Sequence, residues 1–80
     1  MNESPRFQEG EDVRPIARLR EELGMTQAEF ASALGVSAAR PSLWELGREK
    51  MSPGAISSVC RRFPKQLRKL RISPLDLMEG

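Results

Sequence analysis

The chain has 80 residues, of which 39% are hydrophobic and 30% are charged. This length allows one domain with one small core and leaves little room for a catalytic lobe. Because the chain has one cysteine and no histidine, it cannot form an intrachain disulfide, a zinc finger or a histidine-based catalytic triad. We therefore expect no enzyme, no metal site and no cofactor.

The sequence carries no apolar run long enough to span a membrane and no N-terminal signal pattern. A lone cysteine is typical of proteins in a reducing compartment. We therefore expect a cytoplasmic protein without a membrane partner.

The net charge of +2 is unevenly distributed along the chain. Residues 1–30 contain four basic and seven acidic residues, whereas residues 31–80 contain nine basic and four acidic ones. A basic half on a nearly neutral chain is typical of a surface that faces a polyanion, although a solvated helical face would have the same composition.

The N-terminal region is predicted to be an arm followed by a helix. Residues 1–11 are polar, contain proline and glycine and lack a hydrophobic period, which predicts a flexible arm. Asp12 is a candidate N-cap for the first helix, and Pro15 falls in its opening turn, where a missing N–H costs little. Apolar residues then recur at helical spacing until Gly24, which suits the left-handed end of a helix.

A second helix is predicted over residues 27–34. Thr26 before it and Glu29 within it have the spacing of a capping box, and Gly35 suits its C-terminal end. The next helix follows after a connection of only a few residues.

A third helix is predicted over residues 38–46, with Ser37 as its N-cap. Pro41 lies inside it, cannot donate an amide bond to the Ser37 carbonyl and disfavours helical geometry at Arg40. We therefore expect this helix to begin late or to be bent in its first turn.

Serine–proline pairs open two further helical segments, at residues 52 and 73, and Pro64 ends or kinks the first of them. A short basic helix is expected between them, over residues 66–71. The sequence thus predicts an all-α fold of four to five short helices, with one domain over residues 12–63 and a basic and apolar C-terminal segment over residues 64–80.

Two short helices joined by a tight glycine turn are typical of the helix-turn-helix motif. The runs GMTQAEFA at 24–31, LGVS at 34–37 and WELG at 44–47 resemble the lambda-repressor/Cro-like (XRE) helix-turn-helix domain. The resemblance covers roughly residues 13–63. It implies a lambda-repressor-like fold whose third helix lies in the major groove of DNA.

The resemblance also implies which side chains meet DNA. Four residues match positions that read base edges: Ala38, Ala39, Arg40 and Leu43. Five match positions that contact phosphates: Gln27, Ser37, Ser42, Arg48 and Lys50. By the same resemblance Trp44 belongs to the core rather than to a base-stacking site, and Glu45 ties helices together by a hydrogen bond or ion pair.

Each site assignment has a simpler alternative, in which the side chain is only exposed, solvated or, at Ser37, a helix cap. Ala38, Ala39 and Leu43 cannot donate hydrogen bonds. They could contact thymine methyl groups, leave specificity to DNA shape, or face a protein.

The C-terminal segment carries more apolar residues than a short tail needs, namely Leu67, Leu70, Ile72, Leu75, Leu77 and Met78. We expect them to form a homodimer interface, as similar segments do in several relatives; the alternative is that they cover the chain's own core. A dimer would fit a palindromic operator with half-sites about 34 Å apart. The basic residues between positions 61 and 71 could add phosphate contacts or flank that interface.

The sequence therefore predicts a sequence-specific regulator of transcription that binds double-stranded DNA as a homodimer. It would act by occupying an operator, as a repressor that excludes RNA polymerase or as an activator that contacts it. One alternative is a protein-binding helix-turn-helix module of the antitoxin or anti-activator type. A purely structural helical bundle is another, but it leaves the localised positive charge unexplained.

Overall fold

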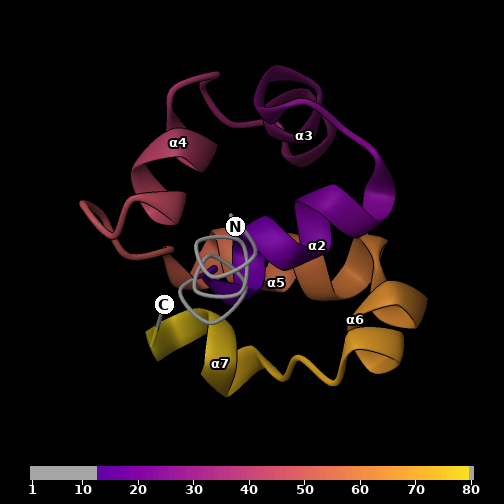
Figure 1. The fold of residues 1–80 in the computed structure, drawn as a ribbon. Helices are drawn as coiled ribbons and strands as arrows, with labels where there is room; N and C mark the ends of the chain where they lie inside the picture. Colours follow the sequence, from indigo (N-terminus) through magenta and orange to yellow (C-terminus); the bar gives the residue numbers. More distant parts are fainter. Residues whose placement is uncertain (1–12, 80) are drawn as a thin grey trace, which may run out of the picture.

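The computed structural model describes residues 13–79, and the chain is all-helical over this range, which confirms the expected fold class (Figure 1). The described residues form α2 (Pro15–Leu23), α3 (Gln27–Leu34), α4 (Arg40–Glu45), α5 (Pro53–Arg62), α6 (Pro64–Leu70) and α7 (Pro74–Glu79). The last segment, which the serine–proline pair at residue 73 opens, is a helix of six residues. The predicted arm at residues 1–11 lies outside the described residues. Within residues 13–79, no helix is long and apolar enough to cross a membrane.

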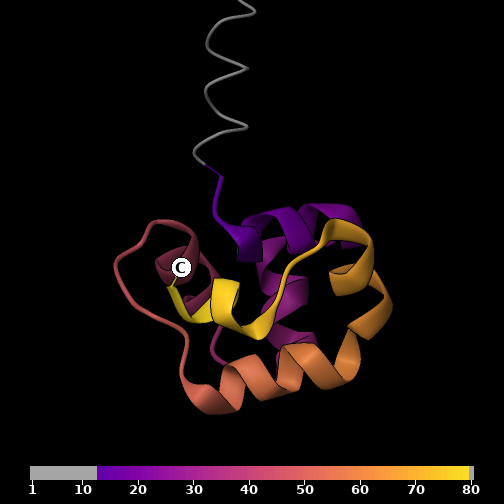
Figure 2. The same cartoon turned by 90° about the horizontal axis from the view of Figure 1, so that it is seen from below.

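Helix α2 holds the fold together, because it packs against α4, α6 and α7. Helix α3 packs against α4 and α5, and α5 packs against α6 and α7. Figures 1 and 2 show the result: α4 and α6 lie at opposite ends of the molecule, with α2 between them. The basic residues that follow α4, Arg48 and Lys50, are therefore separated in space from the basic residues between positions 61 and 71.

The core is formed by apolar side chains from all parts of the described chain. Leu19, Phe30 and Val59 have no exposed surface, and Trp44 is 4% exposed, as expected for a core residue. The rings of Phe30 and Phe63 stack with their centroids 6.0 Å apart. Burying large aromatic side chains supplies much of the stabilisation available to a domain of this size.

Local signals set the ends of the helices, with one exception. Thr26 and Glu29 form the predicted capping box at the start of α3, and Gly35 ends that helix in the left-handed conformation at φ 73°. The N-cap of α2 is Arg14, not Asp12, which lies outside the described residues. The reason is that Pro15 occupies the first position of the helix, which suits its fixed φ and missing N–H.

The start of α4 follows the expectation from Pro41. The helix begins at Arg40, two residues later than the predicted boundary, and its N-cap is Ala39 rather than Ser37. The Arg40 amide donates to the Ser37 carbonyl at 3.0 Å in a tight turn. Pro41 has no amide hydrogen to continue a regular α-helix from that carbonyl, so residues 38 and 39 form a turn instead.

The C-terminal segment packs into the same core as the rest of the domain. Leu67, Ile72 and Leu77 are buried there, and Leu70 is half-buried against it. These four side chains stabilise their own chain, which is the alternative left open by the sequence. The predicted dimer interface is thereby narrowed to Leu75 and Met78, which are 57% and 53% exposed.

Candidate nucleic-acid interface

The connection between α3 and α4 is compact and has a defined geometry. Gly35 adopts the left-handed conformation, and its amide donates to Ser32 at 3.2 Å. The Val36 amide donates to Ala31 at 3.0 Å, and the Val36 side chain packs against the core. These bonds satisfy carbonyls at the end of α3 and fix the direction in which the chain enters α4.

Helix α4 presents one face to the core and another to solvent. Pro41 and Trp44 are buried, so they anchor the helix on α2 and α3. Four predicted contact residues at its leading edge are exposed: Ser37, Ala38, Ala39 and Arg40. Ser42 and Leu43 are half-buried. The structure thus brings these six residues together on one edge of the molecule.

A network of hydrogen bonds fixes α4 against the N-terminal end of α3. Arg20 on α2 donates from Nε to Oε2 of Glu45 at 2.7 Å and from a terminal nitrogen to Oε1 at 3.1 Å. Gln27 donates from Nε2 to the same Oε1 at 3.0 Å. A further Arg20 nitrogen donates to the Met25 carbonyl at 3.0 Å. Glu45 therefore ties three helices together, in agreement with the helix-tying role that the resemblance implies.

The surroundings of Arg20 favour its charged form. The Arg20 and Glu45 side chains are only 18% and 11% exposed. The hydrogen bond to Glu45 raises the pKa of Arg20, against the lowering effect of partial burial. Because the pKa of Arg20 is raised, the contribution that its own titration makes to stability is fully present below the ordinary arginine pKa and is lost as the pH rises through the raised one.

Gln27 is placed as a candidate phosphate contact by this network. It is the first residue of α3, where the first backbone N–H groups have no partner within the helix and the helix dipole is positive. One N–H of its amide is held by Glu45, which leaves the second free to donate. The amide is therefore oriented before any ligand arrives.

Arg40, the strongest candidate for base reading, has a partner within its own chain. Its guanidinium forms an ion pair with Glu49 in the loop after α4. Both side chains remain partly exposed, and an arginine has five N–H donors, so part of the fork is still available. Reading a guanine with both terminal nitrogens would require Arg40 to release Glu49.

The loop after α4 carries Arg48 and Lys50, both exposed. Its backbone is held close to α4, because the amides of Arg48 and Glu49 both donate to the Leu43 carbonyl, at 2.9 and 3.3 Å. The loop therefore presents Arg48 and Lys50 beside α4, on either side of Glu49, and neither has a carboxylate partner within residues 13–79. Charge without fixed side-chain geometry suits phosphate rather than base edges.

Gly47 allows this loop to turn under an arginine. It has φ 74°, a left-handed conformation in which glycine is favoured. A Cβ at this position would also collide with the guanidinium of Arg14, whose Cζ would lie 2.8 Å away. The start of α2 and the end of α4 are thus in direct contact.

Arg20 and Glu49 were missed by sequence reasoning, although both shape this site. Arg20 lies 25 residues from Glu45 along the chain, and Glu49 lies between two basic residues in a loop. No local spacing signals such pairs, because they depend on how the helices pack.

Comparison with known proteins agrees with this geometry. Residues 14–63 match the model of a family described as a helix-turn-helix domain. No curated protein and no solved structure matches the chain.

Proposed function

The chain belongs to the helix-turn-helix domain family, and from this we propose that it is a sequence-specific regulator of transcription that binds double-stranded DNA. The observation that carries the proposal is the edge that leads into α4, where Ser37, Ala38, Ala39 and Arg40 are exposed while Pro41 and Trp44 anchor the helix in the core. An α-helix fits the major groove, and residues near its N-terminus are those that reach base edges in this motif.

The proposed readout combines a few side chains with close approach. Ala38 and Ala39 let the backbone come near the base edges and can contact thymine methyl groups. Leu43 adds a half-buried apolar side chain one turn further along α4. Arg40 has the longest hydrogen-bond-donating side chain among residues 37–43. We propose that its guanidinium releases Glu49 and binds a DNA base or a phosphate.

Phosphate contacts are proposed on both sides of that edge. Gln27 would donate from the start of α3, and Ser37 and Ser42 from the connection and from α4. Arg48 and Lys50 would meet the backbone through the loop. Such contacts position a protein on DNA without reading its sequence.

We propose that the protein binds a palindromic operator as a homodimer, because one small module buries too little DNA for tight specific binding. Leu75 and Met78 support this, since they are large apolar side chains more than half exposed on α7. Met78 also borders a groove of about 700 Å³ that is lined by Met51, Ile56 and Cys60. Occupying an operator would exclude RNA polymerase or present a surface to it, in the cytoplasm and without a catalytic step.

A protein-binding role on the same fold is the second candidate. It is favoured by the apolar character of the α4 edge, where Leu46 is 63% exposed beside Leu43. A protein partner would use such side chains as anchors. It would not need the basic side chains of the neighbouring loop, Arg48 and Lys50.

A salt titration on a duplex selected from random sequence separates the two roles. We expect the affinity of the protein to fall steeply with salt. Arg40→Ala should cost about 1–3 kcal/mol on the selected duplex and much less on a scrambled one, whereas Lys50→Ala should weaken both equally. Selection that enriches no sequence, together with a DNA-independent protein complex, would contradict the proposal.

A further inference from the structure

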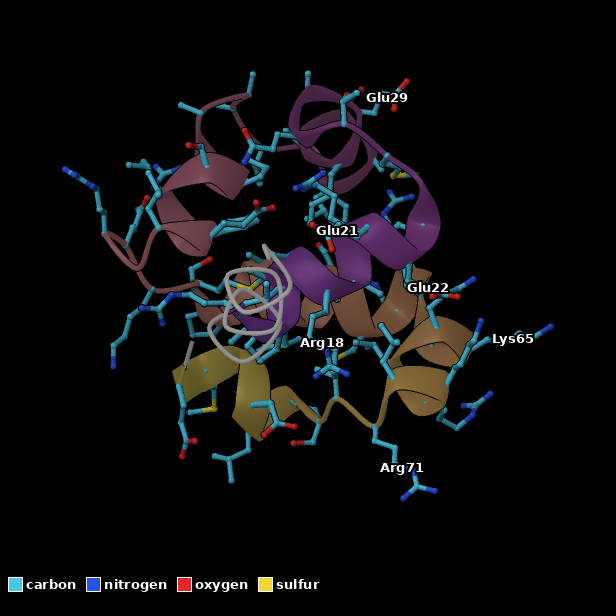
Figure 3. The ribbon with its side chains drawn as sticks, viewed as in Figure 1. Arg18, Glu21, Glu22, Glu29, Lys65 and Arg71 are labelled. Carbon is cyan, nitrogen blue, oxygen red and sulfur yellow. The ribbon has the colours of Figure 1, made fainter. Side chains whose placement is uncertain are left out.

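A second basic surface lies at the far end of the molecule from α4. It consists of the exposed side chains at the end of α5 and along α6, here called the α6 basic patch: Arg61, Arg62, Lys65, Arg68, Lys69 and Arg71. No acidic residue occurs between positions 61 and 71. Figure 3 shows Lys65 and Arg71 projecting away from the ribbon at this end.

The protein neutralises little of this charge itself. Lys69 pairs with Glu22 of α2 at 2.5 Å, and its side chain is still 68% exposed. Within residues 13–79, the other five basic side chains of the α6 basic patch have no carboxylate partner. A surface whose charges serve only solubility normally mixes both signs.

Part of this charge has a cost to the fold. Like charges near one another on a helix repel, and Lys65 lies in the first turn of α6, where the helix dipole disfavours a cation. Arg71 ends α6 in the left-handed conformation at φ 59°, the one residue other than glycine within 13–79 with a positive φ. Glycine or asparagine is the usual choice there. The helix-ending geometry therefore does not explain why an arginine stands at this position.

The chemistry of the α6 basic patch favours a phosphate backbone over a protein or a membrane. The apolar residues of the same segment, Phe63, Leu67 and Leu70, face the chain's own core. The patch thus offers no apolar anchor for a protein partner and no apolar face to enter a bilayer. Apart from Glu22, which pairs with Lys69, it offers exposed positive charges, which is the requirement for contacting regularly spaced phosphates.

We infer that the α6 basic patch binds the phosphate backbone of a second DNA duplex. Helices α4 and α6 lie on opposite sides of α2 (Figures 1 and 2), so a straight duplex on α4 does not also lie along α6. A chain with both surfaces occupied bridges two DNA segments. Binding at the patch stands independently of the proposed function, whereas bridging rests on it.

The test compares two sets of substitutions on the full chain. Lys65→Gln/Arg68→Gln/Arg71→Gln removes charge from the patch, and Arg48→Gln/Lys50→Gln removes charge beside α4. Affinity for a labelled random-sequence duplex is measured by anisotropy at low salt, and bridging by capture of that duplex on a second, bead-bound duplex. The thermal midpoint of each variant, from circular dichroism, confirms that it is folded.

We expect the triple patch variant to lose about tenfold or more in affinity for the random duplex, with a shallower salt dependence, and to lose bridging. The variant beside α4 should keep binding through the patch and lose bridging. A triple patch variant that binds and bridges like the unchanged protein overturns the inference. This conclusion does not depend on how the variant beside α4 behaves. Displacement of the duplex by polyglutamate of equal charge also overturns it, because the patch would then recognise acidic polypeptide.

Arg71→Gly distinguishes a role of Arg71 in DNA binding from a role in the stability of the fold. Glycine relieves the left-handed backbone, so the thermal midpoint should rise or stay unchanged. The affinity for the random duplex should nevertheless fall two- to threefold, about the effect of one lost phosphate contact. Unchanged affinity in this variant would remove Arg71 from the site.

Discussion

The ion pair between Arg20 and Glu45 should carry much of the attachment of α4 to the rest of the fold. Glu45 accepts two hydrogen bonds from Arg20, at 2.7 and 3.1 Å, and both side chains are mostly covered. Arg20→Ala leaves the Glu45 carboxylate with Gln27 as its remaining hydrogen-bond partner. A mostly buried charge without its counter-ion is strongly destabilising.

The size of the effect follows from where the pair lies between surface and interior. Breaking a fully buried pair costs about 3–5 kcal/mol, and an exposed pair contributes about 0.2–1 kcal/mol. With 18% and 11% exposure, we expect Arg20→Ala to cost about 2 kcal/mol, or about 10 °C in the thermal midpoint of a domain this small. Glu45→Ala alone should also cost about 2 kcal/mol and the double variant about 2.5 kcal/mol, which gives a coupling of about 1.5 kcal/mol.

The assay is urea unfolding followed by the fluorescence of Trp44, for the two single variants and the double variant. The matched control is the Lys69–Glu22 pair, which is far more exposed and should couple by less than about 0.5 kcal/mol. Because the pKa of Arg20 is raised by Glu45, its coupling should be as large at about pH 9 as at about pH 7. Equal coupling in the two pairs would refute the argument that burial makes this bridge strong.

Three further predictions follow from single features of the structure. Glu49→Gln removes the acid beside α4 and should strengthen binding to a selected duplex severalfold in filter-binding assays, with a steeper salt dependence; weaker binding would mean that the carboxylate positions its arginine partner usefully. Gly35→Ala places a Cβ on a left-handed residue with open space around it, so its cost of about 1 kcal/mol in chemical denaturation is purely conformational. Gly54→Ala, inside a helix, should instead stabilise by about 0.5 kcal/mol, and equal effects at the two glycines would contradict this reasoning. Leu75→Asp with Met78→Asp should shift the protein to monomers in light scattering while its circular dichroism spectrum stays helical, because both side chains are already exposed in one chain.

Local chemistry made most of the helices predictable. The capping box at Thr26, the glycine at position 35 and the Ser52 cap each act over three or four residues, so their spacing is visible in the sequence. Pro41 likewise predicts a late start for α4, because its missing amide hydrogen affects only its immediate neighbours. Asp12 was a plausible cap, but the preference of Pro15 for the first helical position set the boundary of α2.

Long-range placement was not predictable in the same way. The apolar residues of the C-terminal segment have a spacing that suits either a dimer interface or a core, and only the packing of α6 and α7 places Leu67, Ile72 and Leu77 inside. The partners of Arg40 and Glu45 were equally invisible, since neither pair has a helical spacing. The identity of the exposed edge at residues 37–40 followed from the resemblance, whereas the tie between Arg40 and Glu49 required the structure.

The most direct measurement of the central claim is an amide chemical-shift titration of the folded protein with a selected duplex at physiological salt. The account predicts that the largest shifts fall on residues 37–43, on Gln27 and on the loop at 48–50. Shifts confined to other surfaces, or no shifts at all with any duplex, would contradict the claim that α4 is presented to DNA.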